Sequence, residues 1–96
     1  MNVHELLKQK REEILQIASR HGVTHIRIFG SAARGESRED SDIDFLIEVN
    51  GPTTPWFPGS LVADLEKLLG RRVDVVEPEA IRKPLRERIL QEAVPL

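Results

Sequence analysis

Two aspartates separated by one residue, Asp42 and Asp44, are the side chains of this sequence that most clearly suggest chemistry. They open the run DIDFLIEV, residues 42–49, whose alternating apolar residues predict a strand. Residues i and i+2 of a strand face the same side, so the two carboxylates can converge on a hard divalent cation. Mg²⁺ favours sites that combine a few carboxylates with waters and phosphate oxygens. The alternative is a pair of solvated residues on an exposed sheet face.

The charge around this pair favours a bound cation. From Glu36 to Glu48 the chain carries six carboxylates and one base, Arg38. Like charges at this density repel one another unless a positive group lies among them. A third acid, Asp74, interrupts the β-branched run RVDVV, residues 72–76. If that strand lies beside the first, three carboxylates share one face of a sheet.

A glycine–serine pair, Gly30 and Ser31, follows directly after the predicted strand 23–29. Glycine allows a ligand to approach the backbone, and the N–H groups that open a following short helix suit phosphate oxygens. The hydroxyl of Ser31 adds a donor. On its own such a pair more often marks an ordinary turn or helix cap, so its meaning depends on its neighbours.

The surrounding pattern predicts one domain, residues 1–96, of mixed helices and strands. A first helix has Asn2 as its N-cap, Glu5 three residues later as a capping box, and Gly22 at its C-terminal end. The further expected elements are strands 23–29, 42–49 and 72–76, a helix 61–69 capped by Ser60, and an amphipathic helix 79–93 with Pro84 near its first turn. The fold class is therefore α+β or α/β, with a small mixed sheet of three to four strands and helices on one face.

Composition narrows the function. The absence of cysteine excludes disulfides, thiolate nucleophiles and cysteine-based metal sites, and it fits a reducing cytoplasm. A net charge of −2 argues against holding nucleic acid by bulk electrostatics. No apolar run reaches the ~20 residues of a membrane span. We therefore expect a cytoplasmic protein with a local site and without a membrane partner.

Together these residues resemble a known family. Gly30-Ser31, ten residues, and then Asp42-x-Asp44 form the GS-x10-D-x-D signature of the polymerase-beta-like nucleotidyltransferase superfamily. The longer string FGSAARGESREDSDIDFLIE, residues 29–48, resembles the minimal nucleotidyltransferases of the MntA group, antitoxins that are paired with HepT toxins. The resemblance extends over nearly the whole chain, including the acid at Asp74 and a closing helix rich in Arg and Glu.

The resemblance implies a polymerase-beta-like fold and a reaction in which a hydroxyl attacks the α-phosphorus of a nucleoside triphosphate and pyrophosphate leaves. Asp42, Asp44 and Asp74 would be the catalytic residues and would ligate two Mg²⁺ ions, and Asp74 would also orient or deprotonate the acceptor hydroxyl. Gly30 and Ser31 would bind the β- and γ-phosphates. Arg34 matches the string GSxARG, which implies a phosphate or structural role, with a surface salt bridge as the alternative.

The leading hypothesis is Mg²⁺-dependent transfer of AMP from ATP to a hydroxyl of a partner protein. For the MntA group that partner is the HepT toxin, modified on a tyrosine, which would make this chain an antitoxin. One alternative is an antitoxin that acts by binding alone, against which the three intact acids count. Another is a nucleotidyltransferase for a small-molecule hydroxyl, against which the small size of the chain counts. Base preference, oligomeric state and the number of nucleotides transferred are not readable from the sequence.

Overall fold

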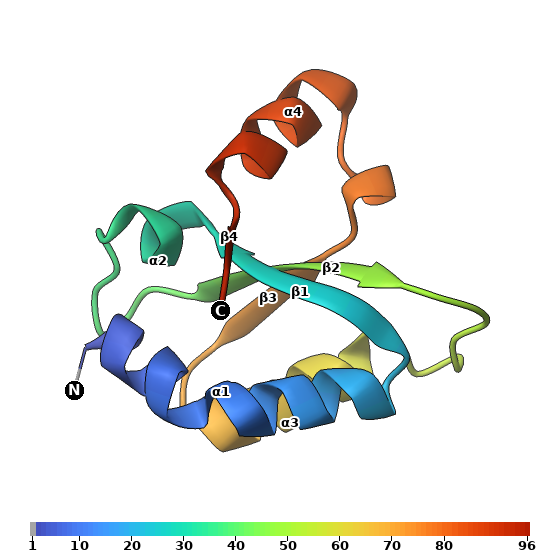
Figure 1. Cartoon of the computed structure of the whole chain (residues 1–96), viewed down its shortest axis with the longest axis horizontal. Coiled ribbons are helices and arrows are strands. Elements are labelled where there is room, and N and C mark those ends of the chain that lie inside the picture. The colour runs from blue at the N-terminus through green and yellow to red at the C-terminus, as the bar shows by residue number, and fades with distance from the viewer. Residues whose placement is uncertain (1) are drawn as a thin grey trace.

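A computed structural model describes residues 2–96 as a four-stranded sheet of strand order β3-β2-β1-β4 with helices on both faces (Figure 1). Strand β1 is antiparallel to both β2 and β4, whereas β2 and β3 are parallel, so the sheet is mixed as predicted. In chain order the elements are α1 Val3–Arg20, β1 Val23–Phe29, α2 Gly30–Arg34, β2 Ile43–Val49, α3 Gly59–Leu69, β3 Val73–Val76, a 3₁₀ turn Pro78–Ala80, α4 Lys83–Glu92 and β4 Val94–Pro95.

The main core lies between one face of the sheet and helices α1 and α3. Alternate residues of β2 point into it and are fully buried, and they meet apolar residues of both helices. The largest fully buried members are Ile14, Ile43, Phe45, Ile47, Leu61 and Leu65. Because side chains alternate across a strand, burying Ile43 and Phe45 on this face turns Asp44 to the other. The core thereby fixes the direction of the acid.

The opposite face of the sheet is only partly covered, by α4 and the 3₁₀ turn (Figure 1). A small cluster of Phe29, Leu46 and Ile81 is buried there, with Ile89 of α4 and Ala93, the residue after this helix, packed against it. The predicted fold class is confirmed. The structure differs from the expectation of helices on a single face because α4 lies across the second face.

Two local predictions hold and one fails. The side chain of Asn2 accepts a hydrogen bond from the backbone N–H of Glu5 at 2.8 Å, as expected for the N-cap of α1. Strand β1 has the predicted bounds. The predicted cap at Ser60 is wrong, because α3 begins at Gly59 and its N-cap is Pro58. The hydroxyl of Ser60 instead lies 3.4 Å from Nδ1 of His21.

The predicted helix 79–93 is also wrong at its start. Residues Pro78–Ala80 form a 3₁₀ turn, and α4 begins only at Lys83, with Pro84 in its first turn. A proline within a longer helix would lose a hydrogen bond and clash with the carbonyl four residues earlier. The amphipathic pattern overstated burial as well, since α4 has no fully buried residue and Leu85 and Leu90 are exposed.

Within residues 2–96, none of the helices combines the length and the apolar character that crossing a membrane requires.

Candidate active site

Asp44 and Asp74 are direct neighbours on adjacent strands. The parallel register of β2 and β3 pairs Asp44 with Asp74, two residues that therefore share one face of the sheet. Neighbouring strands lie ~4.8 Å apart, which brings the two carboxylates within reach of a common ligand. The condition stated from the sequence, that the strand of Asp74 lies beside the strand of Asp44, is met.

Asp42 lies one residue before β2, at the entrance of the same strand. Its neighbour Ile43 donates a backbone hydrogen bond to the carbonyl of Arg72 at 3.0 Å, which ties this end of β2 to the start of β3. One carboxylate oxygen of Asp42 accepts from Nε of Arg72 at 3.1 Å. The Arg72 side chain is 80% exposed, so this ion pair contributes little to stability and can open at low cost.

The electrostatics of the pair are most visible at Asp44. Partial burial, and then the negative charges of Asp74 and Asp42, raise the pKa of Asp44 to about 6. The positive charge of Arg34 opposes this shift without cancelling it. A carboxylate whose pKa is raised by its neighbours lacks a compensating positive charge. The acidic side of the site would therefore be stabilised by a bound cation.

Gly30 brings the backbone of the turn against Asp44. Its φ is +70°, a conformation that glycine adopts without strain, and a Cβ placed there would lie 2.3 Å from Oδ2 of Asp44. Only glycine fits both requirements. The predicted turn and its short helix are confirmed as α2, which ends at Gly35 in a left-handed conformation. The backbone of the Gly30-Ser31 turn thus lies against the carboxylate of Asp44.

The turn is already occupied by a carboxylate from the end of α4. The N–H of Gly30 donates to Oε2 of Glu92 at 3.0 Å, and a guanidinium nitrogen of Arg34 donates to Oε1 of Glu92 at 2.6 Å. Arg34 also donates to Glu36 at 3.0 Å. The hydrogen bond to Glu92 raises the pKa of Arg34, and the same bond lowers the pKa of Glu92. In this state Arg34 joins α2 to α4, which agrees with a structural role.

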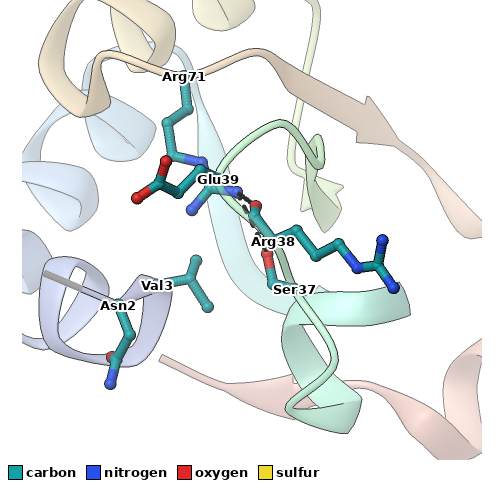
Figure 2. Close-up of a pocket in the computed structure, with 6 residues that line it drawn as sticks. All are labelled: Asn2, Val3, Ser37, Arg38, Glu39 and Arg71. Carbon is teal, nitrogen blue, oxygen red and sulfur yellow. Dashed lines mark hydrogen bonds between the residues drawn. The ribbon is translucent and has the colours of Figure 1, made fainter.

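The loop 36–41 that leads to Asp42 is held by Arg71 (Figure 2). The guanidinium of Arg71 donates to the hydroxyl of Ser37 at 3.2 Å and to the carbonyl of Ser41 at 2.8 Å, and also to the carbonyl of Arg38. The chain from Arg71 to β3 thereby clamps the loop before β2. These contacts set the position from which Asp42 enters the site.

The donor set of this site suits Mg²⁺. Asp42, Asp44 and Asp74 offer carboxylate oxygens alone, the ligands that hard divalent cations prefer, and burial together with their mutual repulsion raises the pKa of Asp44. In residues 2–96, no three His, Cys, Asp or Glu side chains already converge as a metal-binding group. The side chain of Asp42 is turned to Arg72, so it would have to rotate away to join a metal held by the other two.

Comparison with known proteins identifies this arrangement. The family model for the nucleotidyltransferase domain matches residues 7–96. The chain belongs to the nucleotidyltransferase family. One relative comes from Methanocaldococcus jannaschii and is named as a protein adenylyltransferase by inference. It is 40% identical over 94 residues, which cover 98% of this chain and 97% of the relative. Protein adenylyltransferase MntA of Thermococcus cleftensis is 37% identical over 79 residues, 82% of this chain and 80% of its own.

Solved structures support the same membership. A structure described as a minimal nucleotidyltransferase by inference has a TM-score of 0.86 and 46% identity, and the match covers 96% of this chain and 94% of that one. A toxin–antitoxin structure with AMP-PNP has a TM-score of 0.74 and 20% identity, over 88% of this chain and 69% of that one. At that identity the second likeness concerns the fold. This chain is a minimal nucleotidyltransferase with the polymerase-beta-like fold that was predicted.

Two residues of this nucleotidyltransferase site were not found from the sequence. Glu92 is 62 positions from Gly30 in the chain, and no motif links them. Arg71 belongs to no motif in the sequence, yet it holds the loop before Asp42. Neither residue carries a local signal, because both act through contacts that only the tertiary fold creates.

Proposed function

We propose that this nucleotidyltransferase is an Mg²⁺-dependent protein adenylyltransferase, which transfers AMP from ATP to a tyrosine hydroxyl of a HepT-like toxin and so acts as an antitoxin. The observation that carries the proposal is the in-register pairing of Asp44 with Asp74 beside the Gly30 turn. This pairing places uncompensated negative charge next to backbone donors suited to phosphate. Those are the two halves that phosphoryl-type transfer from a metal-bound nucleotide requires.

In the proposed reaction the acceptor oxygen forms a bond to the α-phosphorus and the bond from that phosphorus to pyrophosphate breaks. Asp42, Asp44 and Asp74 would hold two Mg²⁺ ions, which when bound neutralise charge on the entering and leaving oxygens. Asp74 would accept the proton of the acceptor hydroxyl or orient it. The backbone of Gly30 and the hydroxyl of Ser31 would hold the β- and γ-phosphates. Catalysis would then rest on positioning and charge neutralisation.

The proposed partner follows from the relatives and from the open site. The two curated relatives carry the name protein adenylyltransferase, and one of them is MntA. A structure with the same fold is described as a toxin–antitoxin complex with AMP-PNP. In the present chain, the face that bears Asp44 and Asp74 is only partly covered, by α4. An acceptor protein could therefore reach the acids directly.

The test is a transfer assay with ATP, Mg²⁺ and a cognate HepT-like protein, read by intact mass. We expect AMP additions on the partner, located on a tyrosine, and their loss in Asp42→Asn/Asp44→Asn or when EDTA replaces Mg²⁺. Asp40→Asn, which removes an exposed loop acid two residues from the site, is the matched control and should leave transfer within about twofold.

Other results would contradict specific parts of the proposal. A partner that stays unmodified but is still neutralised by the double variant would indicate an antitoxin that acts by binding alone. Label transferred from ATP to small hydroxyl compounds, and not to the protein, would indicate a small-molecule nucleotidyltransferase.

A further inference from the structure

Glu92 accepts the hydrogen bond of a backbone N–H, that of Gly30, which a bound triphosphate would need. Its Oε2 accepts the N–H of Gly30 at 3.0 Å, and its Oε1 accepts from Arg34 at 2.6 Å, so one carboxylate bridges the turn and the nearest arginine. A charge-assisted pair of this kind is stronger than a neutral hydrogen bond. A phosphate oxygen is an anionic acceptor of the same type, and a single N–H cannot serve both fully.

The position of Glu92 also has an electrostatic cost for the site. Its negative charge adds to the electrostatic repulsion at Asp44. The pair is partly exposed to solvent, since the Glu92 side chain is 27% exposed and that of Arg34 is 48% exposed. Solvent can therefore hydrate the Glu92 carboxylate once it leaves. The hydrogen bond between Gly30 and Glu92 can therefore form in the free protein and be broken when another anion takes the place of Glu92.

An alternative place for the Glu92 carboxylate exists on its own helix. Arg88 lies four residues earlier on α4, and its charge already favours the ionised form of Glu92. Side chains four residues apart on a helix can pair. Both residues border a pocket of about 260 Å³ that Phe29 and Leu85 also line. The carboxylate can thus swing from the Gly30 turn toward Arg88 without unfolding α4.

We propose that Glu92 is a built-in competitor of the nucleotide, a carboxylate that fills the Gly30 phosphate position in the free protein and must be displaced when the triphosphate binds. The inference rests on the proposed function, because it assumes that a triphosphate uses the Gly30 turn. Displacement also frees Arg34 from its shorter contact and makes it available to phosphate. The affinity for ATP is then set partly by this internal exchange.

The test is calorimetric titration of ATP with Mg²⁺ into the wild type and Glu92→Gln, with Glu87→Gln as the control. Glu87 is an exposed acid on the same helix, so its variant makes the same change of net charge away from the turn. We expect Glu92→Gln to bind about 5- to 20-fold more tightly, the size of a modest coupling between sites. The Glu87 variant should stay within about twofold of the wild type.

A second readout does not depend on ATP. The amide resonance of Gly30 in the free protein should shift in both Glu92→Gln and Glu92→Ala and not in Glu87→Gln, while thermal melting checks that the variants fold. An unshifted Gly30 resonance, or ATP binding by Glu92→Gln that equals or falls below the wild type, overturns the inference and leaves the proposed function standing. If neither wild type nor variant binds ATP, the proposed function fails and the inference fails with it.

Discussion

The two sides of the site differ in how their charges are balanced. On the strands, Asp44 faces Asp74 and has its pKa raised to about 6, with Arg34 compensating only in part. On the turn, Gly30 and Arg34 share the carboxylate of Glu92, and the pKa of Glu92 is lowered by that contact. One side holds negative charge without a matching cation, whereas the other holds donors that an anion of the same chain already satisfies.

This difference indicates how the two sides meet their substrate. The strand side gains from any cation that arrives, so metal binding relieves repulsion that folding alone leaves in place. On the turn side, a phosphate must replace the carboxylate of Glu92. The free energy gained is therefore only the difference between the interactions of a triphosphate and those of Glu92 with the same donors. Mg²⁺ would therefore bind where acids repel one another, whereas the triphosphate would bind where the donors are already paired with Glu92.

The largest effect should come from a substitution at Gly30 that makes the turn clash with the carboxylate of Asp44. Gly30→Ala places a Cβ 2.3 Å from Oδ2 of Asp44, at a positive φ that alanine tolerates poorly. We expect AMP transfer to fall about 100-fold or more, because displacement of a site carboxylate by ~1 Å is enough for such a loss. Gly35→Ala is the control, since Gly35 has a φ of +73° with open space around its Cβ position. Equal losses in the two variants would show that backbone strain alone, and not contact with Asp44, is responsible.

A smaller effect should follow when the loop 36–41, which precedes Asp42, loses its contacts with Arg71. Arg71→Ala removes the contacts to Ser37, Arg38 and Ser41, and we expect the free energy of unfolding to fall by about 1–2 kcal/mol. Arg72→Ala, which removes an exposed ion pair with Asp42, should cost less than about 0.5 kcal/mol. Urea denaturation of both variants measures the difference. A cost at Arg72 equal to that at Arg71 would contradict the role given to the loop contacts.

The smallest effect is a pH dependence of stability that belongs to the strand side. In the folded protein the pKa of Asp44 is about 6, above its value of about 4 in an unfolded chain. Between these pH values the folded state binds more protons, so the free energy of unfolding should decrease as the pH rises from about 4 to 7. Allowing for solvent screening of a half-buried group, the decrease from Asp44 is about 1 kcal/mol.

Asp44→Asn should remove this part of the pH dependence and make the metal-free protein more stable than wild type near pH 7. Denaturation in EDTA across the pH range measures it as the difference between the two proteins. A variant whose stability runs parallel to that of the wild type from pH 4 to 7 would mean that burial and the neighbouring acids do not raise the pKa of Asp44.

The strands and the signature residues could be predicted because their signals are local. The alternation in residues 42–49 shows that Ile43, Phe45 and Ile47 share one face, and the N-cap at Asn2 depends on residues three positions apart. The sequence also placed Asp74 in a strand. That this strand lies next to β2, in register with Asp44, was stated only as a condition, since strand order is not encoded locally.

The C-terminal region was predicted less well, for identifiable reasons. The apolar spacing from Ile81 to Leu90 suggested one helix, but Pro84 confines α4 to a later start. Strand β4, two residues long, pairs with β1 and has too little sequence to show a period. Glu92 is the last residue of α4, and its contact with Gly30 exists because α4 packs against the second face of the sheet.

The parallel pairing of β2 and β3 has an evolutionary consequence. Asp44 and Asp74 are spaced by the hydrogen-bond ladder of a sheet whose other face is fully packed, so their separation does not depend on any loop. The exposed residues of α4, including Leu85 and Leu90, carry no such constraint. Substitutions at these exposed positions can therefore alter the surface beside the acids while the spacing of the two strands stays the same. The surface next to the acids and the spacing of the acids can thus change independently of each other.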